Sequence, residues 1–358
     1  MGCCEATNVN LSGVVGPEGY ELGELDRRTA LKGMLGIAGV IAVSSGAPVA
    51  LAADATKLKL AFCGQLLCVV PYEVTRARGH FAEQGLDVEL IYTRGGNQAM
   101  QALVGGSVDY AGTSFDVAVQ AFAKGAQIKR LASTGRLPLF ALAVAPKNKD
   151  SVKTIKALEG KTVGVSGLGN ADHALMLYLL QHEGADPKKV NFAILGTNIM
   201  ESVRLGQVDA AMVQEPALSL IVGAGGGDLF NAMDLQQATR MLGGAYEFMG
   251  VAVRTEERDR RMAEMKKLAE ALRKGLADTR TISPDEIIAA LPKALLAGSD
   301  LAQLKEIIVR YRTSLYPESV TIDIQSAERV LKAQEVANII KPGQVDLGKL
   351  LDTAALGG

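Results

Sequence analysis

Four short polar turns of the sequence carry residue types that bind small solutes. One contains Gln65, and the others span residues 95–98, 113–116 and 166–173. Each turn precedes an apolar segment with helical spacing, so its backbone N–H groups are expected at the N-terminus of a helix. Such groups bind an anionic or carbonyl oxygen, although the same residue types also cap helices that bind nothing. We therefore predict that these turns provide ligand contacts.

The side chains of these turns, with nearby aromatic and acidic residues, form the candidate binding set. Its members are Gln65, Tyr72, Gly96, Asn97, Ser114, Phe115, Asn170, Asp172, His173, Asn198, Glu215 and Tyr246. Tyr72 and Tyr246 are expected to form aromatic walls, and Glu215 either contacts the ligand or braces the crossing strands. Phe115 and His173 also fit ordinary core and surface positions, respectively. No residue is predicted to be catalytic.

The elements that must position these turns alternate between strand-like and helix-like segments. Residues 57–62 and 86–93 have strand character, and residues 69–85 between them have the pattern of a helix that begins near Pro71. The alternation continues to Arg254, after which the chain is helical and amphipathic. This order is typical of parallel sheets covered by helices. We predict an α/β fold of two doubly wound lobes, joined by two crossing strands, with additional C-terminal helices.

A repeated phrase divides the chain into two halves. "GSVDYAGTSFD" at residues 106–116 resembles "GQVDAAMVQEP" at residues 206–216, which aligns Asp109 with Asp209. Both aspartates follow a glycine that ends a helical segment, where a carboxylate typically bonds turn amides, so we expect them to be structural. The repeat predicts two similar lobes with a ligand cleft between them.

The predicted domain boundaries follow from the same repeat. Lobe 1 comprises residues 53–143 together with residues 250–358, and lobe 2 comprises residues 144–249. The chain is expected to cross between the lobes near residues 143–146 and again near residues 244–251.

Composition restricts the partners of this chain. Of its 358 residues, 48% are hydrophobic and 22% are charged, and the formal net charge is −1. Such a chain has no basic field to hold nucleic acid or an anionic membrane. Aromatic residues make up 4% and Trp is absent, which disfavours a surface that stacks sugars or bases. A small-molecule partner is the remaining expectation.

Residues 1–52 have the pattern of an export signal. Arg27 and Arg28 precede an apolar run rich in glycine and alanine, and its Ala-Leu-Ala ending predicts cleavage before Ala53. The paired arginines resemble a twin-arginine signal. Gly, Ser and Pro48 interrupt the run before it reaches the roughly 20 residues of a membrane span. We expect a monomeric mature protein in the periplasm.

Cys63 and Cys68 are the cysteines that follow the predicted cleavage point. In an oxidising compartment they either pair as a disulfide or stay as two free thiols near a pocket. Neither cysteines nor histidines have the spacing of a zinc site, so no metal and no cofactor are expected.

Several blocks of the sequence resemble one family. "VVPYEVTRARGHFAEQGLDVEL", "ALEGKTVGVSG", "EGADPKKVNFAILG" and "LGQVDAAMVQEP" are similar, in this order, to segments of the ABC-importer substrate-binding proteins of the sulfonate, nitrate, taurine and thiamine-precursor group. The resemblance implies a type II periplasmic binding protein that delivers a solute to a membrane permease driven by a separate ATPase. The chain agrees, since it has no Gly-x4-Gly-Lys-Ser/Thr phosphate loop of its own.

Two ligand chemistries stay open at this point. A sulfonate, nitrate or similar oxyanion fits helix N-termini, but Arg94 and Arg136 lie outside the cleft-facing turns by pattern. The carboxylates of Asp116, Asp172 and Glu215 are unfavourable beside a bare anion. They fit a taurine-like zwitterion, a thiamine-precursor pyrimidine or another heterocycle such as a flavin. Two other classes are a pyrimidine-synthase-like enzyme, whose cysteine-rich motif is missing, and a periplasmic sensor domain.

Overall fold

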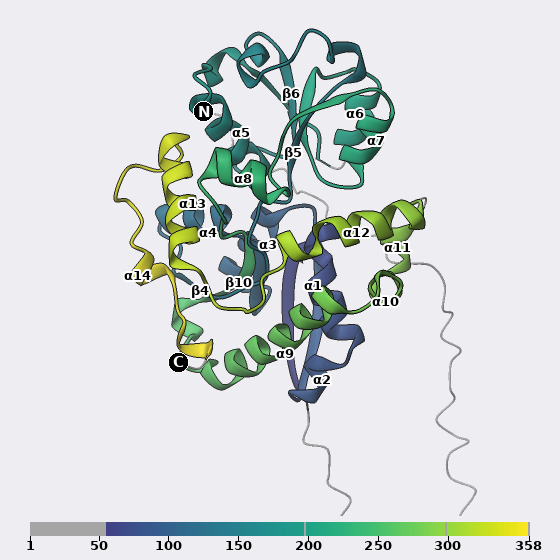
Figure 1. Cartoon of the computed structure of the whole chain (residues 1–358). Helices are drawn as coiled ribbons and strands as arrows, with labels where there is room; N and C mark the ends of the chain where they lie inside the picture. Colours follow the sequence, from purple (N-terminus) through teal and green to yellow (C-terminus); the bar gives the residue numbers. More distant parts are fainter. Residues whose placement is uncertain (1–54, 197, 298, 357–358) are drawn as a thin grey trace, which may run out of the picture. The chain divides into compact units, whose positions relative to one another are not determined.

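The computed structural model of this chain describes residues 55–196, 198–297 and 299–356. The predicted export signal lies outside these residues, and so does the cleavage point before Ala53. In the part of the chain that is described, no helix has the length and apolar character needed to cross a membrane. The described chain forms two five-stranded sheets with helices packed around them (Figure 1).

The first sheet has the strand order β2-β1-β3-β10-β4. β1 pairs in parallel with β2 and β3, whereas β10 runs antiparallel to both of its neighbours. The strands are β1 (Thr56–Cys63), β2 (Leu86–Thr93), β3 (Tyr110–Ser114), β4 (Ile128–Ser133) and β10 (Met249–Arg254). β3 and β10 are buried along their whole length, as expected for inner strands of a sheet covered on both faces.

The second sheet has the order β7-β6-β8-β5-β9, in which β5 is the antiparallel strand. Its strands are β5 (Ala141–Val144), β6 (Thr162–Val165), β7 (Asn191–Ile194), β8 (Ala210–Val213) and β9 (Gly227–Asn231). Because β5 already belongs to this sheet, the chain first crosses over residues 134–140. The crossing expected near residues 143–146 lies earlier in the chain. The apolar sequence of β5 resembles that of a connecting strand, which explains the difference.

The two sheets are built on one plan. When β6 to β9 are matched with β1 to β4, the strand orders become identical, and the antiparallel strand stands fourth in each. That strand is β10 in the first sheet and β5 in the second, so each is adjacent in sequence to a crossing segment. The predicted class, an α/β fold of two lobes with C-terminal helices, is confirmed.

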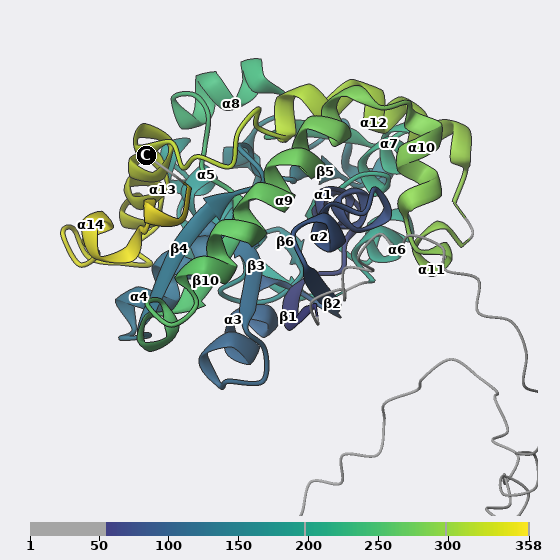
Figure 2. The same cartoon turned by 90° about the horizontal axis from the view of Figure 1, so that it is seen from below.

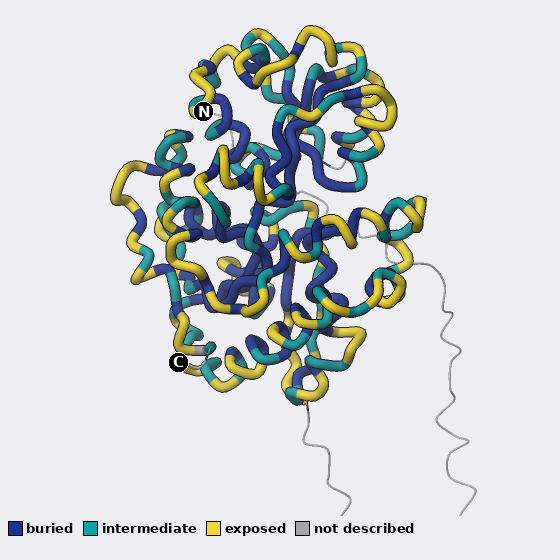
Figure 3. The backbone as a smooth tube through the Cα atoms, in the orientation of Figure 1, coloured by how far each residue is buried: buried dark blue, intermediate teal, exposed yellow. Residues whose placement is uncertain are grey.

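Fourteen α-helices are found among the described residues. They are α1 (Leu66–Ala77), α2 (His80–Glu83), α3 (Gly96–Val104), α4 (Phe115–Ala123), α5 (Ala171–His182), α6 (Ile199–Arg204), α7 (Ala217–Gly223), α8 (Leu235–Leu242), α9 (Met262–Thr281), α10 (Pro284–Ala290), α11 (Lys293–Leu296), α12 (Leu301–Leu315), α13 (Ile324–Val336) and α14 (Leu347–Leu350). In Figure 2, α9 runs across strands of the first sheet beside α1. Buried residues follow the strands, and exposed residues lie on outer helices and loops (Figure 3).

A glycine in β3 shows how tightly the first lobe is packed near the strand ends. A Cβ atom at Gly112 would lie 2.6 Å from the hydroxyl oxygen of Tyr72 and 3.1 Å from the Cβ of Phe62. The rings of Tyr72 and Phe62 stack with their centroids 4.7 Å apart. Only a residue without a side chain lets α1 approach β3 this closely. This contact holds the start of α1, and with it the first candidate turn, against the sheet.

Candidate functional site

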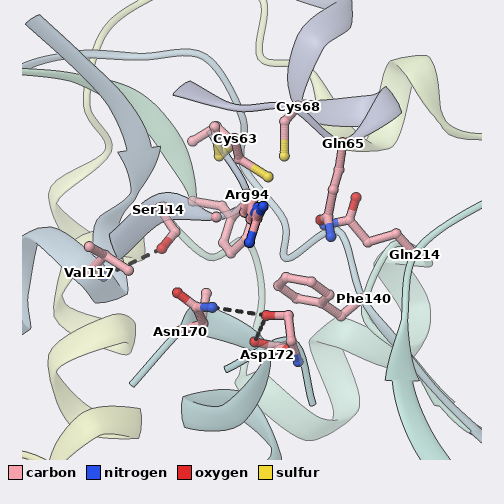
Figure 4. Close-up of a pocket in the computed structure, with 16 residues that line it drawn as sticks. Cys63, Gln65, Cys68, Arg94, Ser114, Val117, Phe140, Asn170, Asp172 and Gln214 are labelled. Atoms are coloured by element: carbon pink, nitrogen blue, oxygen red, sulfur yellow. Dashed lines mark hydrogen bonds between the residues drawn. The ribbon is translucent and has the colours of Figure 1, made fainter. Parts of the chain in front are cut away.

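A cavity lies where strands from both sheets end. Its lining residues lie at or after the ends of β1, β2, β3, β6 and β8, or come from the two crossing segments and the start of β10 (Figure 4). They are Cys63, Gln65, Cys68, Arg94, Gly95, Gly96, Ser114, Val117, Phe140, Ser166, Asn170, Ala171, Asp172, Gln214, Phe248 and Met249. The carboxyl ends of the strands are the usual ligand position in parallel α/β sheets.

Four helices begin at this cavity. α1, α3, α4 and α5 have Gln65, Gly95, Ser114 and Asn170 as their N-cap residues, and all four residues line the cavity. Ser114 accepts a hydrogen bond from the Val117 amide at 3.4 Å, whereas the other three caps make no side-chain bond to the helix. Gln65 and Gly95 thus leave the first N–H groups of α1 and α3 available to a ligand, whereas the Asp172 carboxylate interacts with the first N–H groups of α5. The four positive helix ends favour an anion.

A second cavity adjoins the first. Both are lined by Gln65, Phe140, Ser166, Asp172 and Gln214, and the second also includes Glu215. Its volume is about 210 Å³, compared with about 30 Å³ for the first. Together they form a space lined by apolar side chains and a few polar groups, with room for a solute of a few non-hydrogen atoms.

One wall of the first cavity is apolar. The rings of Phe140 and Phe248 meet edge to face with their centroids 5.8 Å apart, and Val117 and Met249 complete the wall. Phe140 and Phe248 lie in the two crossing segments, between β4 and β5 and before β10. The segments that join the two lobes thus form a hydrophobic surface beside the helix N-termini.

The carboxylate of Asp172 is already engaged by its own turn. Ser166 donates two hydrogen bonds to it, from the backbone N–H at 2.5 Å and from the hydroxyl at 2.8 Å. Burial raises the pKa of Asp172 to about 6, against the opposing effect of these Ser166 donors. Asp172 stabilises the turn between β6 and α5 and has little capacity left for a cationic ligand group.

The carboxylate of Glu215 is likewise hydrogen-bonded by a nearby residue, at the start of α7. Its two carboxylate oxygens accept hydrogen bonds from the backbone N–H and the hydroxyl of Ser219, each at 3.0 Å. Glu215 is buried and lines the second cavity. The two acidic side chains of the site are therefore both satisfied within the protein.

Arg94 and two amides offer the free polar groups of the first cavity. Within the described residues, the guanidinium of Arg94 takes part in no ion pair, although its backbone N–H donates to Gln98 at 2.9 Å. The buried side-chain oxygens Oδ1 of Asn170 and Oε1 of Gln214 have no hydrogen-bond partner. Unpaired buried polar atoms that line a cavity indicate a place where a ligand or water binds.

A buried arginine stabilises the backbone that carries Phe248 in the apolar wall of the first cavity. Arg130 donates hydrogen bonds to the carbonyl oxygens of Thr113 and Gly250, each at 2.7 Å, and to that of Phe248 at 2.8 Å. Its charge is balanced by Glu247, whose pKa is raised to about 7 by burial. Because Arg130 joins β4 to the ends of β3 and β10, it positions Phe248 at the cavity.

The structure brings several predicted site residues together. Gln65, Gly96, Ser114, Asn170 and Asp172 line the first cavity, and Glu215 lines the second. They come from both lobes. Each follows a strand-like segment, and this position is the feature that predicts them.

Three predicted residues lie in the core and line neither cavity. Tyr72 is fully buried and its hydroxyl lies 3.1 Å from that of Thr134. Tyr246 is also buried and donates to Asp116 at 2.8 Å, while the ring of Phe115 packs under the Arg130 guanidinium at 5.7 Å. The expected aromatic walls of Tyr72 and Tyr246 are replaced by Phe140 and Phe248, since the tyrosine hydroxyls are taken by core partners.

Asn97, His173 and Asn198 also lie outside the two linings. The Gly169 amide donates to Nδ1 of His173 at 3.2 Å, and the imidazole meets the Phe192 ring edge to face. Burial lowers the pKa of His173, which favours its neutral form. Asn97 lies beside Gly169, and Asn198 is exposed.

Sequence reasoning missed or misplaced four groups of the lining. Arg94 follows β2 directly and lines the cavity, whereas the sequence pattern predicts a position outside the cleft-facing turns. Gln214 stands between β8 and Glu215, where the strand-end rule would have found it. Phe140 and Phe248 lie in crossing segments, which carry no motif that distinguishes a cavity wall from core.

The described residues contain no group of three or more His, Cys, Asp and Glu side chains that would hold a metal ion. Two α/β lobes of one plan, with a polar cavity at their strand ends, define the class of two-lobed solute-binding folds. The sequence pattern of the "NMT1/THI5 like" family matches residues 69–287, and the chain belongs to this family. No curated protein sequence gives a significant match.

Solved structures share the fold over most of its length. A protein from Bordetella bronchiseptica RB50 is 24% identical with a TM-score of 0.76, over 84% of this chain and 96% of that one. The alkanesulfonate-binding protein SsuA from Xanthomonas axonopodis pv. citri, bound to MOPS, is 17% identical with a TM-score of 0.66, over 84% and 99%. The periplasmic nitrate-binding protein NrtA from Synechocystis PCC 6803 is 14% identical with a TM-score of 0.66, over 85% and 88%.

Proposed function

We propose that this protein is a periplasmic solute receptor of an ABC importer and binds a small sulfonate-type anion in the paired cavities. The observation that carries this proposal is the convergence of four helix N-termini and Arg94 on one cavity, whose acidic residues are already hydrogen-bonded. A bound anion would be delivered to a membrane permease with a separate ATPase subunit. The receptor would act as a monomer after export by the twin-arginine route.

The charge of the ligand follows from the state of the carboxylates. Asp172 and Glu215 gave the main reason to expect a cationic or N–H-bearing ligand. Each is occupied by donors of its own turn, Ser166 and Ser219. Among the groups that still lack a protein partner, the N–H groups at the starts of α1 and α3 and the Arg94 guanidinium bind anions. These contacts favour a sulfonate over an ammonium ligand.

The apolar wall selects among anions. The small exposed part of the Phe140 and Phe248 rings gains hydrophobic contact only from a ligand that presents carbon to it. A short alkyl chain attached to a sulfonate does so, whereas nitrate does not. SsuA of Xanthomonas binds alkanesulfonates and NrtA of Synechocystis binds nitrate, so the shared fold accommodates both kinds of anion.

A second candidate is a small heterocycle such as a thiamine-precursor pyrimidine. The unpaired oxygens of Asn170 and Gln214 would accept hydrogen bonds from its N–H groups. An amide side chain can also turn its NH2 group toward an anion, so these two residues fit both candidates. We place the sulfonate first because Arg94 has no role toward a neutral heterocycle.

Solved structures with this fold include binding proteins, and the sequence has no recognisable nucleophile-base pattern. We therefore propose no enzymatic activity. The lobes would be residues 53–143 with 250–358 and residues 144–249, except that β5 moves residues 141–143 into the second lobe. Closure of the two on a solute would be the signal that the permease reads.

The test is calorimetric titration of the protein with ethanesulfonate and with ethylammonium, which differ in charge and share the alkyl group. We expect saturable binding of ethanesulfonate and none of ethylammonium. Taurine, nitrate and an aminopyrimidine complete the panel, and the melting temperature provides a second readout because a bound ligand stabilises the native state. Binding of the aminopyrimidine alone would overturn the sulfonate proposal in favour of the heterocycle.

A further inference from the structure

The wall of the first cavity contains two cysteines. Cys63 is the last residue of β1, and Cys68 lies in the first turn of α1, after the turn formed by Gly64 and Gln65. Both thiols are free, both residues are buried, and both line the cavity (Figure 4). The proposed binding function gives neither of them a role.

The two thiols are close neighbours. The Cys68 thiol lowers the pKa of Cys63, whereas the Cys63 thiol and burial raise the pKa of Cys68. The turn holds them together, since the amide of Cys68 donates to the carbonyl oxygen of Gln65 at 3.0 Å. Cys63 is thus the member of the pair that ionises first, and a thiolate is the form that attacks a disulfide.

The pair also faces the second lobe. Gln214, directly after β8, lines the same cavity, and its side-chain amide opposes the rise in the pKa of Cys68. Among the described residues, its oxygen Oε1 has no hydrogen-bond partner. A change at the Cys68 sulfur is therefore expected to reach the opposite lobe through Gln214.

We propose that Cys63 and Cys68 are a reversible modification site, at which a disulfide forms by exchange with an external disulfide. The Cys63 thiolate attacks one sulfur of that disulfide, and the displaced thiolate takes up a proton. Cys68 then loses its proton and attacks the Cys63 sulfur, which releases the second external thiol. Two protein thiols are oxidised to one disulfide, and one external disulfide is reduced to two thiols.

We expect Gln214 to favour the reduced state of this pair. Disulfide formation removes the Cys68 thiol and draws its sulfur toward Cys63, so its interaction with the Gln214 amide weakens. That interaction joins the two lobes beside the ligand. Resting on the proposed function, the oxidised form is expected to bind ethanesulfonate on the order of five-fold more weakly, the effect of one lost polar contact.

The modification is tested on the full chain carrying Cys3→Ser and Cys4→Ser, so that Cys63 and Cys68 are its only thiols. The protein is equilibrated with oxidised and reduced glutathione, quenched in acid, unfolded and alkylated, and its mass is measured. We expect a species with no alkylated cysteine in oxidised glutathione and two alkylated cysteines after return to reduced glutathione. Persistence of both thiols, or a stable glutathione adduct without ring closure, overturns the proposal.

The role of Gln214 is tested in the same assay without ligand. Gln214→Ala is expected to raise the equilibrium constant for oxidation about five-fold, because the reduced form loses the polar contact with the Gln214 amide. Gln207→Ala is the matched control, since Gln207 is exposed and lines neither cavity. Equal shifts in the two variants would overturn the contact between Gln214 and the thiol pair.

Ethanesulfonate titration of the reduced and oxidised forms closes the experiment, with Cys68→Ala as a variant that cannot form the disulfide. Weaker binding by the oxidised form, and no effect of glutathione on Cys68→Ala, support the coupling. Equal affinity of the two forms overturns the coupling alone. Binding by neither form overturns the proposed function and the coupling together, while the mass measurement still decides whether the disulfide forms.

Discussion

Asp109 and Asp209 make the same contact in the two sheets. The Asp109 carboxylate accepts a hydrogen bond from the backbone N–H of Lys59 at 2.7 Å, and the Asp209 carboxylate accepts one from that of Thr162 at 2.8 Å. Their own amides donate back to the carbonyl oxygens of Lys59 and Thr162 at 3.0 and 2.9 Å. Each aspartate thereby joins the segment just before the third strand of its lobe to the first strand, at Lys59 in β1 and at Thr162 in β6.

We expect Asp209→Ala to lower the free energy of unfolding by about 1–3 kcal/mol, because the amide of Thr162 loses its carboxylate partner. Burial alone would raise the pKa of Asp209, but the Thr162 amide and the Asn148 side chain lower it overall. A lowered pKa means that this stabilisation is present above the pKa of the unfolded state, about 3.9, and is lost as the pH falls below it. Urea unfolding at pH 7 and pH 3 measures both effects.

Asp150→Ala is the control for this experiment. Its carboxylate is fully exposed and pairs only with Lys153 at 3.3 Å. Surface pairs of this kind contribute little, so the variant should unfold like the parent protein. A loss of stability as large as that of Asp209→Ala would contradict the assigned role of Asp209.

The repeat and the fold were predictable because both depend on patterns between residues that are close in the sequence. The alternation of strand and helix segments and the recurrence of Asp109 at Asp209 need no knowledge of distant contacts. The same is true of cavity residues that cap helices directly after strands, such as Ser114 and Asn170. A residue in this position points to the strand-end edge of its sheet in any parallel α/β fold.

The rest of the site depends on contacts between distant segments. Tyr72 lies in the core because Gly112 leaves space for its ring. Tyr246 lies in the core because Asp116 accepts a hydrogen bond from its hydroxyl. Phe140 and Phe248 line the cavity because the crossing segments pass beside it. No local pattern separates these two pairs of aromatic residues, which explains why the sequence favoured the tyrosines.

Tyr246→Phe is expected to reduce stability and to leave ligand affinity unchanged. The variant removes the hydrogen bond to Asp116 Oδ1, which keeps only the Gln334 amide at 2.8 Å, and the expected loss is about 1–3 kcal/mol. Since Tyr246 does not line either cavity, the affinity for ethanesulfonate should stay within about two-fold of the parent. Thermal unfolding and calorimetric titration separate the two readouts, and a large loss of affinity at full stability would return Tyr246 to the site.

Arg94→Ala should have the opposite profile. The guanidinium supports no ion pair among the described residues, so we expect stability to change little. A charged hydrogen bond to the ligand contributes enough that its loss weakens ethanesulfonate binding on the order of ten-fold or more. Arg240→Ala, at an exposed position on α8 outside both cavities, provides the matched change in net charge. Equal affinities in the two variants would show that only the overall charge matters.

Asp172 should make anion binding depend on pH. Burial raises its pKa to about 6, so the cavity gains a negative charge as the pH rises through this value. We expect the affinity for ethanesulfonate to increase as the pH falls from 7 to 5, because a protonated Asp172 no longer repels the ligand. Asp172→Asn should flatten this dependence between pH 5 and 7. Asp116→Asn is the control, since burial raises the pKa of Asp116 to about 6 as well, but its side chain lines neither cavity. If Asp116→Asn flattened the profile and Asp172→Asn did not, the anion would lie away from the α5 N-terminus.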